Sequence, residues 1–584
     1  MSFINFHKNS ETLPHTNPNQ MASKSSLCRL SFQQKTFVFC LLLVSLPLLL
    51  YTPPLKSQRV LLQVQEQNTG LAWFDAIARD IYTKKIKVGL VNIDEAEHDT
   101  LSEQLYKSYP QVLPTVSVKF DRVDKNLKWQ DFFPEWIDED HKWGDPKCPN
   151  MPMPTLENYQ DVNVVVARVP CGNSNRTEKR GVRDLFRLQV NLVVANLAVE
   201  GGWMKLEGDN RRQVYVVLIG NCGPMIEIFR CDDLLMHQGE YWVYKPELTR
   251  LKQKILMPPG SCQIAPAYAQ TGKEVWRAYL SELKVLKHDP RPKLAYVTML
   301  HTSEAYVCGA IALAQSILQT PVSVIQFYNY TRDLILLADN SISPMSIKGL
   351  EAAGWKIKRI QRIPNPFAKK GSYNEWNYSK LRIWQLTDYD KIIFIDSDFL
   401  VLKNMDDFFV YPQLSAAPND CTFFNSGLMI IEPSQCMFEE LMRRVWRLDS
   451  YNKGDQGFLN EVFTWWHRLP WRLNRLKDSR EIEEDELYGM HYLGVKPWMC
   501  YKDYDCNWDV EDRRVFASDS AHQLWWDVYE EMPRGLQSYC GLSQRMEERI
   551  LRWRREARNA NFSDMHWNIE IRDPRTRLGK LQVV

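Results

Sequence analysis

Two carboxylates separated by a single residue follow an apolar run in the middle of the chain. Residues 391–395 have the composition of a short buried strand, and Asp396 and Asp398 come directly after it. Ligands of open α/β folds bind at the carboxyl edge of the sheet. The pair at that edge predicts a site for a hard divalent cation that bridges a nucleotide diphosphate, although an acidic turn explains the same residues without a metal.

Three later segments carry groups of matching chemistry. Amides and hydroxyls bind sugar hydroxyls, glycine admits a ligand close to the backbone, an imidazole binds metal, and a lysine binds phosphate oxygens. The groups are, in chain order, Asn425, Ser426 and Gly427, then Asp455 and Gln456, then His491, Gly494 and Lys496. Each segment also has a structural explanation of its own: a tight turn, a helix cap and a hydrogen-bonded core histidine.

Strand-like and helical runs alternate around these residues. Strands are expected at residues 294–300, 322–327, 355–363 and 391–395, and helices at 305–318 and 378–387. Such alternation predicts an α/β layer with a mainly parallel sheet. A charged, arginine-rich pattern at residues 544–559 predicts a further helix that is solvated or packs on the surface.

An earlier region has its own strand-like runs at residues 87–91, 162–166 and 214–219, with a helical pattern at 183–199. Residues 131–155 are rich in proline, tryptophan and charge and predict a long loop, and residues 272–288 have helical spacing. No catalytic constellation stands out here. We therefore expect an accessory α/β region in front of the catalytic one.

The composition favours a large globular protein that does not bind nucleic acid. Of 584 residues, 45% are hydrophobic and 25% charged, and 73 basic against 71 acidic side chains leave no positive field to attract a polyanion. Aromatic residues make up 12%, which suits carbohydrate platforms and large cores alike. Five tryptophans could stack on sugar rings, although core packing is the favoured role for each: Trp376, Trp465, Trp466, Trp525 and Trp526.

An apolar run at residues 37–51, preceded by basic residues, predicts an uncleaved signal anchor with the N-terminus in the cytosol; a cleaved signal peptide is the alternative. Eleven cysteines from Cys148 to Cys540 would then lie in an oxidising lumen, where scattered disulfides are expected and at least one cysteine stays free or pairs between chains. The expected divisions are a cytosolic tail (1–36), the anchor (37–51), a stem (52–84), an N-terminal lumenal region (85–288), the catalytic domain (289–540) and a C-terminal basic helix and tail (541–584).

Taken together and in this order, the motifs over residues 294–526 resemble family 8 of the retaining nucleotide-sugar glycosyltransferases, the glycogenin-like group with a Rossmann-like GT-A fold. The resemblance implies that Asp396, Asp398 and His491 bind Mn²⁺ and that Lys496 binds the diphosphate. It also implies that Asn425, Asp455 and Gln456 contact the donor sugar, with Ser426, Gly427 and Gly494 in the same donor site, that Lys380 is an active-site lysine, and that Tyr306 lies in the uridine pocket. The chain departs from that pattern at Asn452, which replaces an acid, and by one residue fewer between Gly494 and Lys496.

The whole lumenal part resembles the plant glucuronosyltransferases that decorate xylan, through residues 169–172, 183–192, 220–225, 229–234 and 522–526. This resemblance implies a type II Golgi membrane enzyme of cell-wall synthesis that transfers glucuronic acid from UDP-glucuronate to O2 of xylose residues in xylan, with other xylan-synthesis enzymes as candidate partners. Two alternatives stay open: a glycogenin-like transferase with another UDP-sugar or acceptor, and a catalytically silent Golgi scaffold.

For the reaction we expect a same-face substitution in which the leaving phosphate accepts the proton of the acceptor hydroxyl. Asp455 would position the sugar or stabilise an oxocarbenium-like state, and a covalent double displacement through Asp455 is the less favoured variant. Lys380 or Arg382 could meet the carboxylate of the donor, or serve ion pairs of the fold.

Overall fold

The computed structural model describes residues 71–78, 85–171, 183–203, 213–265, 292–320, 332–419, 422–480 and 487–576. The chain divides into the units Met1–Asn68 and Thr69–Val584, and all described residues belong to the second unit. That unit contains a six-stranded sheet, a seven-stranded sheet and a small three-stranded sheet.

The six-stranded sheet belongs to the N-terminal region and has the strand order β2-β1-β3-β4-β6-β5. Its first four strands are parallel neighbours, β6 runs antiparallel to β4, and β5 pairs antiparallel with β6 in a hairpin. Valine-rich β3 and β4 are almost entirely buried, as expected for central parallel strands. The strands are β1 Val88–Val91, β2 Val116–Ser117, β3 Val164–Arg168, β4 Tyr215–Ile219, β5 Leu234–Gln238 and β6 Tyr241–Tyr244.

In its described residues this region has five α-helices, and the predicted helix at residues 183–199 is confirmed as the longest of these, α5. The stem predicted at residues 52–84 needs correction at its end, because α2 buries Trp73, Phe74 and Ile77 in the core of this region. Buried side chains occur all round α5, which shows that it lies inside the region and not on its surface. The helices are α2 Ala72–Ala78, α3 Glu95–Ser108, α4 Trp129–Phe132, α5 Leu185–Trp203 and α6 Leu248–Ile255, with 3₁₀ turns at Leu156–Tyr159 and Cys231–Asp233. Residues 133–155 form the expected loop.

The seven-stranded sheet has the order β14-β12-β13-β10-β7-β8-β9. The block β10, β7, β8 and β9 is parallel, whereas β13 lies antiparallel between β10 and β12, so the expected mainly parallel sheet is confirmed. The strands are β7 Leu294–Leu300, β8 Arg332–Ala338, β9 Lys356–Arg359, β10 Lys391–Ile395, β12 Ser415–Pro418, β13 Phe424–Ile431 and β14 His467–Arg468.

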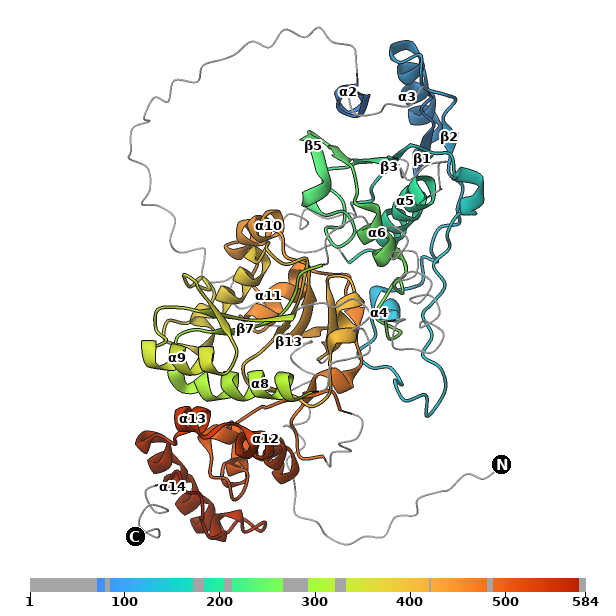
Figure 1. The fold of residues 1–584 in the computed structure, drawn as a ribbon. Helices are drawn as coiled ribbons and strands as arrows, with labels where there is room; N and C mark the ends of the chain where they lie inside the picture. Colours follow the sequence, from blue (N-terminus) through green and yellow to red (C-terminus); the bar gives the residue numbers. More distant parts are fainter. Residues whose placement is uncertain are drawn as a thin grey trace, which may run out of the picture. The chain divides into compact units, whose positions relative to one another are not determined.

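Helices cover this sheet, and Figure 1 shows α8 and α9 side by side along one of its faces, with α10 on the opposite side. The helix α8 approaches the Asp396–Asp398 turn very closely, because a Cβ atom at Gly309 would collide with the carbonyl of Ser397 and the ring of Trp498. The helices are α8 Val307–Gln319, α9 Pro344–Ala352, α10 Gln435–Val445 and α11 Asp455–Val462.

Two expectations for this sheet need correction. Sequence analysis did not anticipate β8 and α9, and the segment expected at 378–387 is a 3₁₀-helix over Tyr373–Gln385, not an α-helix. Polar side chains in that segment bond elsewhere, since Ser379 Oγ accepts the amide of Ile363 and Asn377 donates to Asp455, and such bonds compete with the regular helical ladder. The expected strand at 322–327 and the helix at 272–288 lie outside the described residues.

The three-stranded sheet pairs β16 Gly489–His491 with β11 Phe399–Val401 and with β15 Arg475–Leu476. Beyond it come α12 Asp519–Glu531, α13 Arg534–Gln537 and α14 Gln544–Asn559, and α14 confirms the predicted C-terminal helix. The remaining 3₁₀ turns are Glu304–Tyr306, Asp406–Val410, Trp471–Leu473, Pro497–Met499, Cys506–Asp509, Glu511–Phe516, Ser538–Cys540 and His566–Asn568.

Five disulfides confirm the expectation of scattered pairs: Cys148–Cys262, Cys171–Cys222, Cys231–Cys436, Cys308–Cys540 and Cys500–Cys506. Cys231–Cys436 joins the N-terminal region to α10, and Cys308–Cys540 joins α8 to the C-terminal part. Cys421 is the one of the eleven cysteines that is not in these five pairs, and it lies outside the described residues. The expected anchor at residues 37–51 also lies outside them. In the described ranges, no helix combines the length and the apolar character needed to cross a bilayer.

Candidate active site

The fold brings the three predicted metal ligands together. Asp396 and Asp398 follow β10, and the antiparallel pairing of β11 with β16 places His491 opposite Phe399, beside this turn. Ligand atoms of Asp396, Asp398 and His491 all lie within 4.8 Å of one another. His491 Nε2 lies 3.4 Å from Asp398 Oδ1. Two carboxylates and an imidazole in this arrangement suit a divalent ion such as Mn²⁺.

His491 is oriented by Asn474, just before β15, which is itself held by Asn425 of β13. Its Nδ1 lies 3.0 Å from Asn474 Oδ1, and the Asn474 amide donates to Asn425 Oδ1 at 2.9 Å. The amide oxygen only accepts, so Nδ1 carries a proton, and Nε2 is the nitrogen that faces the carboxylates. A side chain at Gly427 would collide with the imidazole ring, which explains the glycine. Sequence analysis missed Asn474, because a lone asparagine has no distinguishing spacing.

Lys380 connects the metal ligands to the predicted sugar site. Its ammonium lies 3.1 Å from Asp396 Oδ1 and 2.7 Å from Asp455 Oδ2, and it donates to the Ser426 carbonyl at 3.3 Å. Burial alone would lower the pKa of Lys380, but the two carboxylates raise it well above its ordinary value. The lysine therefore stays charged at all physiological pH values.

The two carboxylates around Lys380 respond to burial in different ways. Burial raises the pKa of Asp396, with Lys380 opposing it. The pKa of Asp455 is lowered although burial opposes this, because Lys380 and the hydroxyl of Ser426 stabilise the charged form. Asp455 is thus an ionised carboxylate held in place.

Asp455 begins α11, and both its oxygens have partners. Ser426 Oγ donates to Oδ2 at 2.9 Å, and Asn377 Nδ2 donates to Oδ1 at 3.1 Å. The neighbouring Gln456 accepts the Ser426 amide at 3.2 Å and donates to Tyr451 at 2.9 Å. These contacts tie α11 to β13 and fix the direction of the carboxylate.

Asn425 organises the site from within. Its Oδ1 accepts from the Gly427 amide at 2.8 Å and from Asn474, and its Nδ2 donates to Asn419 Oδ1 at 2.9 Å. The side chain is therefore engaged by the protein itself. Its direct contact with a donor sugar stays a prediction.

Lys496 reaches the metal ligands despite the shortened loop before it. Its ammonium lies 2.7 Å from Asp398 Oδ2 and also donates to the Tyr492 carbonyl. Burial would raise the pKa of Asp398, but Lys496 and His491 hold it far below its usual range. The predicted phosphate-binding lysine and the predicted metal ligands thus form one cluster.

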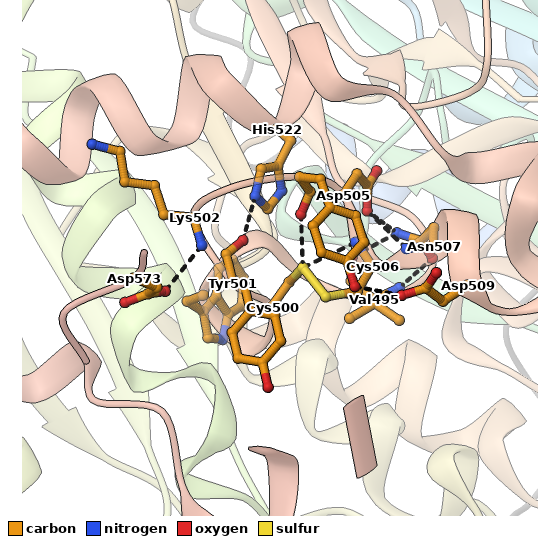
Figure 2. The surroundings of a disulfide bond; sticks show 12 residues. Val495, Cys500, Tyr501, Lys502, Asp505, Cys506, Asn507, Asp509, His522 and Asp573 are labelled. Carbon is orange, nitrogen blue, oxygen red and sulfur yellow. Dashed lines mark hydrogen bonds between the residues drawn. A yellow bond between two sulfur atoms is a disulfide. The ribbon is translucent and has the colours of Figure 1, made fainter. Parts of the chain in front are cut away.

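A buried asparagine shapes this loop, as Figure 2 shows. Asn507 accepts the Val495 amide at 2.8 Å and donates to the Val495 carbonyl at 3.0 Å. Gly494 has φ +73°, and a Cβ there would collide with the amide of Asn507. Asp505 holds Asn507 in turn, next to the Cys500–Cys506 disulfide. Asn507 therefore fixes the backbone of the residue that directly precedes Lys496.

Two tyrosines lie beside the cluster. The Lys496 ammonium is 6.0 Å from the centroid of the Tyr306 ring, which also contacts Trp498 edge-on. Tyr373, the first residue of the 3₁₀-helix that carries Lys380, is 82% exposed. The uridine pocket was predicted at Tyr306.

Arg382 does not reach the site. Its guanidinium donates to the Gln361 carbonyl and to Gln385 and lies over the Phe438 ring. The tryptophans of the two Trp-Trp pairs are also remote from a ligand role, because all are almost fully buried: Trp465, Trp466, Trp525 and Trp526. Core packing of these four is confirmed, and Trp376 alone of the five candidates is partly exposed.

Two family profiles match the chain: the GUX1-5 N-terminal domain over residues 63–262 and glycosyl transferase family 8 over residues 297–500. The second match covers the strands that carry the cluster, and with the mixed sheet it supports an α/β fold of the GT-A type.

Several relatives are similar to the chain along most of its length. UDP-glucuronate:xylan alpha-glucuronosyltransferase 2 of Arabidopsis thaliana is 48% identical, covering 84% of this chain and 81% of the relative. UDP-glucuronate:xylan alpha-glucuronosyltransferase 1 of the same plant is 42% identical, covering 84% and 72%. Glycogenin-1 of Homo sapiens is 29% identical, covering 40% of this chain and 71% of the relative.

Proposed function

We propose a function from one premise: the chain belongs to the family of the UDP-glucuronate:xylan alpha-glucuronosyltransferases, with a catalytic domain of glycosyl transferase family 8. It is a retaining glycosyltransferase that moves glucuronic acid from UDP-glucuronate to O2 of xylose residues in xylan. The observation that carries the proposal is the joining of the metal ligands to Asp455 through Lys380. Burying three charged side chains costs free energy, and a catalytically silent scaffold would gain no activity from them.

The donor set fits a divalent ion, for which we propose Mn²⁺. Asp396, Asp398 and His491 would hold it, since two carboxylates, one imidazole and a tautomer fixed by Asn474 form a coherent ligand set. When bound, the ion would supply positive charge to the diphosphate of the donor and to the departing UDP.

The residues of the chain then divide the remaining work. Lys496 exchanges its ion pair with Asp398 for the phosphate oxygens of the donor. Asp455 and Gln456 position the sugar, and Tyr306 packs beside the uridine. Asn425, Ser426, Gly427 and Gly494 shape the walls of the same site, with Lys380 holding Asp455 in register.

Bond making and breaking occur on one face of the sugar. The acceptor hydroxyl attacks C1 as the bond from C1 to the phosphate oxygen breaks, and that oxygen takes the hydroxyl proton as UDP leaves. Both oxygens of Asp455 already have hydrogen-bond or ion-pair partners, which favours positioning over nucleophilic attack by this carboxylate.

Transfer assays test the proposal. Purified protein with Mn²⁺ is given xylo-oligosaccharides and, in separate reactions, labelled UDP-glucuronate, UDP-glucose, UDP-galactose and UDP-xylose. We expect transfer from UDP-glucuronate and an α-linkage at O2 by nuclear magnetic resonance. A higher rate from another donor would refute the donor assignment, and no transfer from any donor would favour the scaffold.

We further propose that the enzyme is a type II protein of the Golgi membrane, anchored by residues 37–51, and that it works beside other xylan-synthesis enzymes. The five disulfides support an oxidising compartment. In sealed vesicles, protease added outside should leave the disulfide-bonded part intact. Digestion of that part without detergent would contradict the orientation.

A further inference from the structure

The donor in the proposed function carries a carboxylate on its sugar ring. The cations of the cluster already form ion pairs with carboxylates of the protein. Lys380 lies between Asp396 and Asp455, and Lys496 pairs with Asp398. Arg382 bonds elsewhere. A carboxylate that enters a partly closed site needs hydrogen-bond donors or a cation, because leaving it unpaired is costly.

We propose that Arg362 binds the carboxylate of the glucuronosyl group and so sets the preference for UDP-glucuronate over neutral UDP-sugars. This inference rests on the proposed function and names the residue that selects the donor sugar.

The backbone brings Arg362 next to the active-site lysine. Arg362 follows β9, at the same carboxyl edge of the parallel block that presents Asp396 after β10. The amide of the next residue, Ile363, donates to Ser379 Oγ at 3.0 Å. Ser379 directly precedes Lys380, so the backbone at residues 362–363 lies next to the segment that carries this lysine.

The guanidinium is fixed from two sides. Its carbon lies 4.4 Å from the centroid of the Trp376 ring, and Trp376 precedes Lys380 by four residues on the same 3₁₀-helix. Its Nε lies 3.0 Å from Asp339 Oδ2, and the Asp339 side chain is only 3% exposed. Stacking and a buried ion pair together restrict a side chain that is otherwise flexible.

The part of Arg362 that would meet a ligand is available. About a third of its side chain is exposed (34%), and within the described ranges Asp339 is its one acceptor or anionic partner. Pairing through Nε leaves the two terminal amino groups free of protein acceptors. Terminal amino groups in a fixed plane match the two oxygens of a carboxylate.

His301 links this arginine to the sugar site. It follows β7, and it lies within electrostatic reach of Asp455 and Lys380 as well as of Asp339 and Arg362. Burial lowers its pKa, so the imidazole is neutral at pH 7 and does not compete for the carboxylate. Of the two cations near His301, Lys380 is held between two carboxylates, so Arg362 is the one that can pair with the carboxylate of the donor.

Arg359, the last residue of β9, provides a matched control for Arg362. Arg359 donates through Nη1 to the carbonyl of Asp339 at 2.8 Å and to that of Ile342 at 3.4 Å. It supports the same loop, but backbone acceptors engage it. A purely structural function for Arg362 would give Arg362→Gln and Arg359→Gln the same phenotype.

The experiment uses the complete lumenal chain with Mn²⁺. Calorimetry measures binding of UDP and of UDP-glucuronate, and initial rates measure kcat/KM with UDP-glucuronate and UDP-glucose. Arg362→Gln should weaken binding of UDP-glucuronate about 10- to 100-fold, the range for losing a charge-assisted bidentate contact, and leave UDP binding within about twofold. Arg362→Lys should fall between, and Arg359→Gln should keep the donor preference.

Equal losses for UDP and UDP-glucuronate, or no loss for either, would overturn the inference. A wild-type chain that prefers UDP-glucose would instead refute the proposed function itself. If Arg362→Gln fails to bind UDP at all, Trp376→Leu decides, because it keeps the charge and the Asp339 pair but removes the stacking surface. It should weaken UDP-glucuronate about three- to tenfold and spare UDP, and a non-selective effect contradicts the inference.

Discussion

Asp398 shows how tightly the charges of the cluster depend on one another. It faces His491 and pairs with Lys496. It also lies close to the second carboxylate, Asp396, and the two negative charges repel each other. Its pKa lies far below the ordinary range, so the carboxylate stays ionised throughout the pH range of the secretory pathway. Its charge, and not its volume, is what the site uses.

Replacing Asp398 with asparagine therefore tests charge at constant shape. Transfer should fall at least about 100-fold, as expected when a preorganised charged group is lost. The thermal midpoint should fall as well, because Lys496 loses its buried partner and relief of repulsion from Asp396 offsets only part of that loss. Activity assays and calorimetric unfolding measure the two effects, and unchanged transfer would contradict a role of Asp398 in the reaction.

Removal of divalent ions is a separate test of the same residues. EDTA should abolish transfer, and Mn²⁺ should restore it, because Asp396, Asp398 and His491 provide the mixed oxygen and nitrogen ligands that this ion accepts. Near-ultraviolet circular dichroism before and after EDTA is the control for folding. Full turnover in EDTA would contradict a metal-dependent reaction.

At the residue scale the sequence was informative where spacing carried chemistry. Asp396, Asp398, His491 and Lys496 were expected to meet, and they do. Arg382 was expected as a partner for the donor, but a 3₁₀-helix has three residues per turn, so a position two residues after Lys380 points away from it. Isolated polar residues such as Asn474 and Arg362 belong to no motif with a characteristic spacing, so their place in the site could not be predicted from the sequence.

The loop from Gly494 to Asn507 is the element on which the position of Lys496 depends. Asn507→Ala removes both hydrogen bonds to Val495 in a fully buried place. We expect a loss of about 2–3 kcal/mol in unfolding free energy and a higher KM for the donor. Urea unfolding and donor titrations measure these effects.

Asn126→Ala is the control, because Asn126 bonds only the nearby Asp124 at the surface. Unchanged donor KM in Asn507→Ala would mean that Lys496 finds its place without this clamp.

Element prediction succeeded for β7, β10 and α14 and failed for β8 and α9. Most of β8 is buried apolar sequence without alternation, and periodicity cannot distinguish such a run from a buried piece of helix. The parallel sheet was predictable as a class because the pattern repeats, whereas the antiparallel insertion of β13 was not. It depends on pairings between distant segments.

On the scale of the molecule, the N-terminal region supports the catalytic sheet directly. Glu227 accepts the amides of Thr464 and Trp465, which follow α11, and Arg230 pairs with Glu432 at 2.7 Å. Burial would raise the pKa of Glu432, but Lys391 and Arg230 lower it to about 2. Both contacts are buried, so the region belongs to the same folding unit.

A start near Lys84 would remove α2, whose Trp73, Phe74 and Ile77 are buried in the core of the N-terminal region. A chain that begins near Thr69 should therefore be secreted, folded and active, whereas one that begins near residue 289 should not fold. The shorter chain leaves Glu432 without Arg230, and removing one partner of a buried pair costs about 3–5 kcal/mol. Secretion yield and thermal unfolding measure the difference. An active chain starting at residue 289 would show that the N-terminal region is dispensable.

A histidine in the C-terminal part predicts a dependence of stability on pH. Burial alone would lower the pKa of His566, but hydrogen bonds to Asp519 and Asp564 raise it above 6.5. A raised folded pKa stabilises the fold fully below the unfolded value and loses this effect as pH rises through the folded value. The difference in unfolding free energy between wild type and His566→Gln should shrink from pH 5 to pH 9, and a constant difference would contradict the assignment.

The disulfide Cys231–Cys436 gives the two halves of the enzyme a linkage that does not run through the backbone. A protease recognition sequence placed between residues 266 and 291 would split the polypeptide into two fragments that remain covalently attached. On an electrophoresis gel the cut protein should run as one band without reductant and as two with it. The two halves are thus joined both by the backbone and by this disulfide. A single backbone cleavage between them would not separate the fragments until a reductant breaks the disulfide.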